Sequence, residues 1–501
     1  MVLLSGWLVV TAAIWSTERY VQGFSQPKYV DLVFPWRWAR YRSAMGSDYL
    51  KMGRQALQSG NTNTALSYLS EALNVDPGNR ESLRLAVLTR YRLGSRAGVL
   101  ALLRTKVASA AKDGDQGYLQ TFFEIAFDLQ ADDEAFAVGR DMLPKAPDSV
   151  GLHRFIALQM ATARFNRGHY SEAEQILTDW KLQDEPEGEI VFAECEAEQG
   201  RYADAVKRLE GDLAGLKRKD GLYATLVRLA QDQGDAEMEL RYALLRRDAE
   251  PASPKARIDL LYADHALGTG ADIRREIEAY CADFGSDPDA ISLLAQFAIE
   301  AGEPHAAERA RDLAKAKGIA PVEFEIAIAQ ASIAAGDYPR AVKVVTLAQG
   351  EGRSLGQAYE ATLTGTKVVA LFGARDSRAN LAFSNFLPLS ESLPHRAGHF
   401  LAHHLHILGL AEQSQQLLER VCDKDPDDEQ ALAELVSSDA ATGNRDRLLT
   451  DLPRLLKMRK PPRDALDASL MCLDPTTDGA LCQQVTLALS TSPVKASRAG
   501  L

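Results

Sequence analysis

The sequence predicts an all-α fold, a right-handed α-α superhelix (a solenoid) of stacked helix-turn-helix repeats. Three observations predict it: a regular glycine period, small residues in both halves of that period, and prolines at a fixed distance behind the glycines. A period of about 34 residues is typical of two-helix repeats, which stack because neither helix buries its apolar face alone. A stack of this kind offers a long surface for partners.

The glycine period marks the end of the first helix in each repeat. Its intervals run from 32 to 37 residues, except for one of 74 that spans two periods. A residue that adopts positive φ without strain suits a helix C-terminus. The glycines of the period are Gly60, Gly94, Gly168, Gly200, Gly234, Gly268, Gly302, Gly336, Gly373, Gly409 and Gly443.

The second helix of each repeat is marked by small residues and by proline. Pro77, Pro251 and Pro426 each follow a glycine of the period by 17 residues, where proline stops the second helix. Alanines recur in pairs, one on each helix, and let the two helices approach closely. These pairs are Ala161 with Ala173, Ala193 with Ala205, Ala295 with Ala307, and Ala329 with Ala341.

The clearest repeat, residues 46–79, resembles the tetratricopeptide repeat. It carries Leu50, Gly53, Ala56, Gly60, Ala65, Tyr68, Leu69, Ala72 and Pro77. The resemblance covers residues 46–456, as about 12 units. Together with the N-terminal segment it points to the membrane-anchored bacterial type of this family. It implies one continuous solenoid that holds protein partners.

The N-terminal segment differs from the repeats. Residues 1–17 carry no charge, and we expect residues 1–20 to form a transmembrane or signal-anchor segment. Residues 21–45 form a juxtamembrane stretch that mixes aromatic and basic side chains, which suits lipid headgroups. A cleaved signal peptide and a buried helix that caps the solenoid are the alternatives. The basic residues after the apolar run place the solenoid in the cytoplasm, whereas upstream basic residues would place it in the periplasm.

The C-terminal segment contains two further helical patterns. Residues 457–489 are expected to form helices that cap the last repeat, because a solenoid must cover its terminal apolar face. Residues 490–501 are small and polar, and we expect a disordered tail.

Composition and motifs exclude several functions. The net charge is −12 and basic residues are not clustered, so nucleic acid is not an expected partner. The sequence lacks Gly-x-Gly-x-x-Gly, Gly-x-x-x-x-Gly-Lys-Ser/Thr, His-Glu-x-x-His and Gly-x-Ser-x-Gly. We therefore expect no enzyme activity, no catalytic residue and no cofactor.

The resemblance also implies which residues face a partner. In tetratricopeptide proteins the first helix of each unit lines the groove, and counting from the period glycines selects one or two positions in most units. This lining is mixed in charge and does not match the clamp by which some family members hold C-terminal carboxylates. The implied groove residues are Arg54, Arg84, Glu194, Arg228, Tyr262, His265, Gln296, Gln330, Lys367, His399, His403 and His406.

A stripe of histidines is the one local feature of the sequence that suggests a chemical role. His395, His399 and His403 are spaced four apart, and His404 and His406 follow. On a helix, residues four apart share a face, and two imidazoles so placed can hold a metal ion. His399 and His403 are the metal candidates, but no carboxylate or cysteine nearby completes a ligand set. A polar, solvated helix face is the simpler interpretation.

Two hypotheses for function follow. The first is a membrane-tethered scaffold of tetratricopeptide type that binds a protein or peptide partner, of unknown identity, in its concave groove. The alternative is a metal- or pH-responsive binding element that uses the stripe from His395 to His406.

Overall fold

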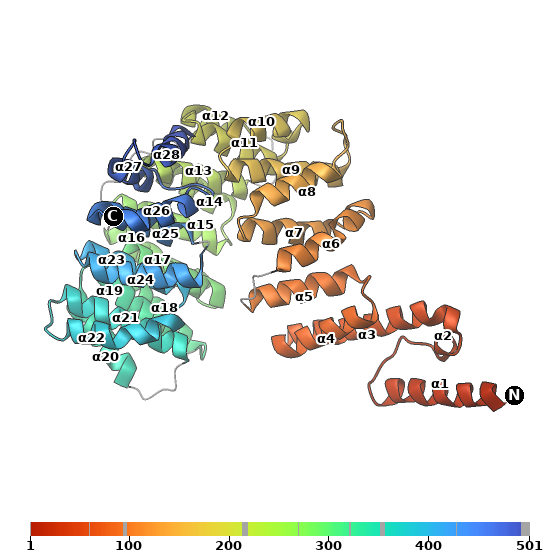
Figure 1. Ribbon diagram of the computed structural model, residues 1–501. Helices are drawn as coiled ribbons and strands as arrows, with labels where there is room; N and C mark the ends of the chain where they lie inside the picture. Colours follow the sequence, from red (N-terminus) through yellow and green to blue (C-terminus); the bar gives the residue numbers. More distant parts are fainter. Residues whose placement is uncertain are drawn as a thin grey trace. The chain divides into compact units, whose positions relative to one another are not determined.

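The protein is built of helices that pack in consecutive pairs. The computed structural model describes residues 2–59, 61–93, 98–212, 219–268, 270–319, 322–350, 356–426 and 428–491. In these ranges every regular element is a helix, 28 of them α-helices and three of them 3-10 helices (Figure 1). The prediction of an all-α fold of stacked helix pairs is confirmed.

The chain divides into two compact units, Met1–Ala163 and Arg164–Leu501. The first unit holds α1 (Val2–Tyr20), α2 (Tyr29–Val33), η1 (Pro35–Arg37), α3 (Trp38–Gln58), α4 (Thr62–Val75), α5 (Arg80–Arg92), α6 (Val99–Lys112), α7 (Gln116–Asp128) and α8 (Asp132–Met142). Helix α9 (Gly151–Asn166) continues from the first unit into the second.

The second unit contains the longer series of pairs. Its first helices are α11 (Pro186–Glu198), α13 (Asp220–Gln233), α15 (Pro254–Ala266), α17 (Pro288–Ala301), α19 (Val322–Ala334), α21 (Gln357–Gly373), α23 (His395–Ile407), α25 (Glu429–Thr442) and α27 (Arg463–Cys472). Its second helices are α10 (Tyr170–Asp179), α12 (Tyr202–Asp212), α14 (Ala236–Ala249), α16 (Gly270–Phe284), α18 (Pro304–Ala316), α20 (Tyr338–Gly350), α22 (Ala379–Phe386), α24 (Ala411–Lys424), α26 (Arg445–Leu455) and α28 (Gly479–Thr491). Two 3-10 helices, η2 (Leu182–Asp184) and η3 (Leu387–Ser392), lie between them.

The period glycines end the first helices, as the sequence predicts. Eight of them have φ between 63° and 77°, the left-handed region in which a side chain would be strained. Gly373 differs, because it closes α21 without positive φ and a Cβ there would lie 2.2 Å from the Tyr338 ring. Close helix packing therefore explains this member of the period. Gly60 and Gly94 lie outside the described residues.

Small side chains sit where the two helices of a pair cross. All eight of the paired alanines are buried. In the pair α3–α4, a Cβ on Gly53 would lie 2.9 Å from the Leu69 side chain and 3.6 Å from the Ala65 carbonyl oxygen. Helix N-termini are closed by side chains, as where the Asp235 carboxylate accepts the Met238 N–H at 3.0 Å.

The expected single-pass membrane location is wrong. No helix among the described residues has both the length and the apolar character that a membrane crossing requires. Helix α1 has 19 residues, but Glu18 and Arg19 belong to it, and its apolar run stays below the ~20 residues of a spanning helix. The aromatic residues expected at a lipid surface bond to the chain instead. The Trp7 Nε1–H donates to the Val33 carbonyl at 2.9 Å, and the Trp15 Nε1–H to the Pro27 carbonyl at 3.0 Å.

The second unit returns on itself. The link between α26 and α27 contacts the helices that begin the unit, 290 residues earlier, where Arg167 donates to the Lys457 carbonyl at 2.6 Å. The Lys460 ammonium donates to the Glu198 carboxylate at 2.9 Å and lies 4.0 Å from the centre of the Phe165 ring. The reader can follow this path from α10 round to α27 in Figure 1. The stack of pairs in this unit therefore closes, and its last link meets its first helices.

The last two helices lie in the stretch expected to cap the repeats. Helix α27 buries Leu466 and helix α28 buries Val485 against the same apolar core as α25 and α26. Most of the expected disordered tail, residues 492–501, lies outside the described residues.

Candidate functional site

Five first helices of the second unit line one continuous hollow. Helices α17, α19, α21, α23 and α25 contribute its residues, and its volume is about 940 Å³. We call it the first-helix groove. Its residues are Ser292, Ala295, Gln296, Ile299, Glu300, Glu323, Phe324, Ile326, Ala327, Gln330, Ala358, Tyr359, Thr362, Pro394, His395, Arg396, Ala397, His399, Phe400 and Gln430.

The wall of the groove is mainly apolar. Phe324 and Ile326 come from α19 and are themselves mostly buried, and Ile299 and Phe400 add apolar surface from α17 and α23. Alanines at 295, 327, 358 and 397 keep the space between the larger side chains open. Apolar surface with polar side chains placed along it is typical of surfaces that bind ligands or chain segments.

Two carboxylates mark the side of the groove formed by α17 and α19. The Tyr262 hydroxyl hydrogen-bonds to Glu300, which also accepts from the Gln296 amide at 2.8 Å. The Tyr359 hydroxyl donates to Glu323. Burial, followed by the Glu300 carboxylate, raises the pKa of Tyr262, so this hydroxyl keeps its proton and stays a donor.

The side formed by α23 carries positive or neutral groups. Arg396 is exposed, and among the described residues no ion pair holds its guanidinium. The neighbouring His395 Nδ1 lies 2.9 Å from the Asp428 carboxylate of α25. The groove is therefore acidic along α17 and α19 and basic at the start of α23.

Two polar groups inside the groove can form further hydrogen bonds. His399 is only 12% exposed at its side chain, and its Nε2 is buried with no hydrogen-bond partner among the described residues. Gln330 is 6% exposed; its amide makes no hydrogen bond within the same part of the chain, and it still reaches solvent in the groove. A buried polar atom without a partner costs free energy, which a ligand that supplied the partner would recover.

The structure brings some of the implied groove residues into this site. Gln296, Gln330 and His399 line it, and Tyr262 contacts its edge through Glu300. Lys367 donates instead to the Gln349 amide oxygen at 2.8 Å, which lies on the second helix α20.

Other implied residues lie on first helices away from this groove. Glu194 and Arg228 pair with one another between α11 and α13. The His265 Nδ1 faces the Glu303 carboxylate at 3.6 Å. In the first unit, Arg54 and Arg84 both bind the Glu81 carboxylate, at 2.9 and 3.0 Å.

Sequence reasoning missed the acidic partners of these residues. Glu81, Glu300 and Glu434 each contact two residues selected from the period, and Glu303 contacts one. In three of these contacts, Tyr262 with Glu300, His265 with Glu303 and His399 with Glu434, the acidic residue follows about one repeat later in the chain. The signal that would have found them is an acidic residue one period after a groove position.

Two members of the histidine stripe face one carboxylate. His399 and His403 both present Nδ1 to a Glu434 oxygen, at 3.8 and 3.6 Å, and His406 is exposed. Glu434 raises the pKa of His403, whereas burial, helped by His403, lowers the pKa of His404 to about 4. Within the described part of the chain, no group of three or more His, Cys, Asp or Glu residues is arranged to hold a metal ion.

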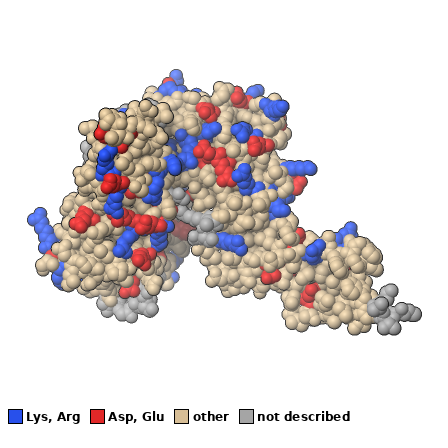
Figure 2. Space-filling view, in the orientation of Figure 1, with Lys and Arg blue, Asp and Glu red and all other residues tan. Residues whose placement is uncertain are grey.

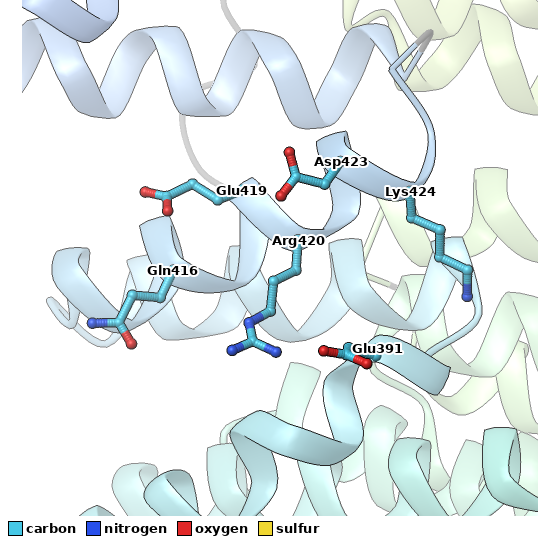
Figure 3. Close-up of a pocket in the computed structure, with 6 residues that line it drawn as sticks. All are labelled: Glu391, Gln416, Glu419, Arg420, Asp423 and Lys424. Atoms are coloured by element: carbon cyan, nitrogen blue, oxygen red, sulfur yellow. The ribbon is translucent and has the colours of Figure 1, made fainter.

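A second hollow lies on the outer helix α24 beside η3. Its six lining residues are charged or polar, and Figure 3 shows Arg420 and Lys424 directed toward the segment that carries Glu391. Arg420 donates to the Leu387 carbonyl and Lys424 to the Leu393 carbonyl, both at 2.7 Å. These cations hold η3 in place, so this hollow is a structural contact.

The visible surface mixes both signs of charge. Figure 2 shows Lys and Arg interspersed with Asp and Glu over that face. Many of these charges are paired across neighbouring helices, such as Arg340 with Glu308 at 2.7 Å. Mixed and paired charge favours a protein partner over a polyanion.

The helix pairs and the 34-residue period resemble those of tetratricopeptide repeats. No protein-family model and no curated protein matches it. Among solved structures, it is similar to a chain of the APC/C hetero-tetramer Cut9-Hcn1, with 12% identity and a TM-score of 0.28 over 86% of this chain and 96% of that one. It is also similar to pilF of Pseudomonas aeruginosa, with 17% identity and a TM-score of 0.31 over 42% of this chain and 95% of that one.

Proposed function

We propose that this chain is a scaffold that binds a protein or peptide partner in the first-helix groove. The observation that carries the proposal is the groove itself: a volume of about 940 Å³ with mainly apolar walls, spread over five helices, in which the buried His399 Nε2 has no hydrogen-bond partner among the described residues. A hollow this long and open fits a chain segment better than a compact small molecule.

Selection of binders from a random peptide library tests this function. We expect the selected peptides to lose at least tenfold in affinity for the variants Gln296→Arg and Tyr359→Ala, which change exposed positions inside the groove. Leu347→Arg, at an exposed position on the second helix α20, is the matched control and should leave binding unchanged. Peptides that ignore both groove variants, or a selection that yields no peptide, would contradict the proposal.

A pH response next to the groove is the second candidate function, favoured by the contact of Glu434 with His403, which does not line the groove, and with His399, which does. Because the pKa of His403 is raised, this residue keeps its proton to a higher pH than free histidine. The positive charge of protonated His403 then balances the negative charge of the Glu434 carboxylate, which His399 also faces. His404 stays neutral down to a pH of about 4. We expect acidic peptides to bind more tightly as pH falls through the titration of His403. His403→Gln should abolish this pH dependence in a fluorescence titration, and its persistence would exclude His403 as the cause.

A further inference from the structure

The sign of the charge changes from one side of the first-helix groove to the other. Glu300 on α17 and Glu323 on α19 are exposed carboxylates at one side, and the unpaired Arg396 on α23 lies at the other. Helix α21 separates them and contributes Ala358, Tyr359 and Thr362, none of which is charged. A partner that complements this pattern carries a basic group and an acidic group with apolar side chains between them.

The conformation of the partner's backbone is selected by two polar groups of the groove. The buried His399 Nε2 has no hydrogen-bond partner among the described residues, and the Gln330 amide, which reaches solvent in the groove, makes no hydrogen bond there either. In an α-helix the backbone N–H and C=O groups are already paired with each other, so a helical partner offers them only at its ends. An extended segment presents free N–H and C=O groups at every residue.

The chain itself shows how a lysine binds between first helices of this unit. Lys460 lies over the Phe165 ring of α9 and donates to the Glu198 carboxylate of α11, at 4.0 and 2.9 Å. An aromatic ring beside a carboxylate thus holds a lysine ammonium. The groove repeats this combination where Tyr359 contacts Glu323.

We infer that the first-helix groove takes an extended peptide segment with a basic residue at one end, an acidic residue at the other and apolar side chains between. The basic residue binds Glu300 and Glu323, and the acidic residue binds Arg396. The apolar side chains contact Phe324, Ile326 and Phe400, and the backbone bonds to Gln330 and His399. This inference rests on the proposed function and adds the chemistry of the partner.

Three synthetic peptides with one shared apolar centre test the inference. The first has a lysine end and a glutamate end, the second has two lysine ends, and the third has two glutamate ends. Binding is measured by fluorescence anisotropy on the full chain. We expect the mixed peptide to bind roughly 5- to 10-fold more tightly than either of the others, because each partly buried charge pair adds a modest term. Equal affinities, or a preference for a like-charged peptide, would overturn the inference.

Charge-neutralising variants assign each end. In the double variant Glu300→Gln, Glu323→Gln, we expect the mixed peptide to lose its advantage over the glutamate peptide only. In Arg396→Gln it should lose its advantage over the lysine peptide only. Glu391→Gln, in the second hollow on α24, is the matched control and should change neither comparison. Variants that change both comparisons equally would contradict the assigned direction.

A helix-stapled version of the mixed peptide tests the backbone conformation. We expect it to bind at least fivefold more weakly than the flexible peptide, and equal or tighter binding would show that the partner is helical. If no synthetic peptide binds while library-selected peptides still bind the groove, the inference fails and the proposed function stands. If neither set binds, the proposed function fails as well.

Discussion

Replacement of Gly188 by alanine is expected to destabilise the second unit by about 3 kcal/mol or more. Gly188 lies in the first turn of α11, where it contacts η2. A Cβ there would lie 2.0 Å from the Leu182 carbonyl oxygen and 2.6 Å from its carbonyl carbon. These are backbone atoms of a residue that is 1% exposed, so no rotamer change relieves the clash. Denaturant unfolding followed by circular dichroism measures the loss.

Gly211→Ala is the matched control for this prediction. Gly211 is also helical, in α12, but no atom of the described residues lies within 4 Å of its added Cβ. Alanine there should stabilise the protein by up to about 1 kcal/mol, because alanine favours the helix over glycine. If both alanine variants were equally stable, the close contact between α11 and η2 would be refuted.

Replacement of Arg246 by alanine is expected to cost about 3 kcal/mol. The Arg246 side chain on α14 is 7% exposed and joins two first helices. It donates to Asp220 of α13 at 2.7 Å and pairs with Asp259 of α15. Removing it leaves the mostly buried Asp259 carboxylate without its cation, and an unpaired buried charge is costly.

The pH dependence of this loss distinguishes charge from packing. Burial already raises the pKa of Asp259, and Arg246 opposes that rise. Without Arg246 the folded state favours the protonated acid more than the unfolded state does, so the cost is largest near neutral pH and shrinks as pH falls. A cost that stays constant with pH would indicate lost packing alone. Arg241 lies on the same helix as Arg246 and forms an exposed ion pair with Glu210 of α12. Arg241→Ala should therefore cost less than about 1 kcal/mol.

The fold was predictable because its constraints are local and repeat along the chain. A glycine that must adopt positive φ, such as Gly234 after α13, leaves a mark in the sequence at each repeat. So does an alanine buried where two helices cross, such as Ala205. The N-terminal segment misled the prediction because Trp7 and Trp15 suit a membrane interface and also suit hydrogen bonds to the chain's own carbonyls. Sequence alone does not separate these two environments.

The groove was predictable only in part. Counting from the glycines found Gln296, Gln330 and His399, which line it. It also selected Lys367, which does not line the groove and instead binds Gln349. The count predicts a position on the helix but not which neighbour a long side chain contacts. The apolar wall of Phe324 and Phe400 was missed, because aromatic residues on a repeat helix more often belong to the core.

The return of the second unit on itself changes how stability is shared within it. In an open array each repeat is held only by its neighbours, and the two ends fray separately. Here the ends share a seam, formed by Lys460 with Phe165 and Glu198 and by Arg167 with the Lys457 carbonyl. These seam contacts are polar or cation–π, whereas successive pairs are joined through an apolar core. The unit therefore closes through a polar seam, and we expect salt that weakens this seam to loosen the end of α9, α11 and the link between α26 and α27 together, while the helices opposite stay packed.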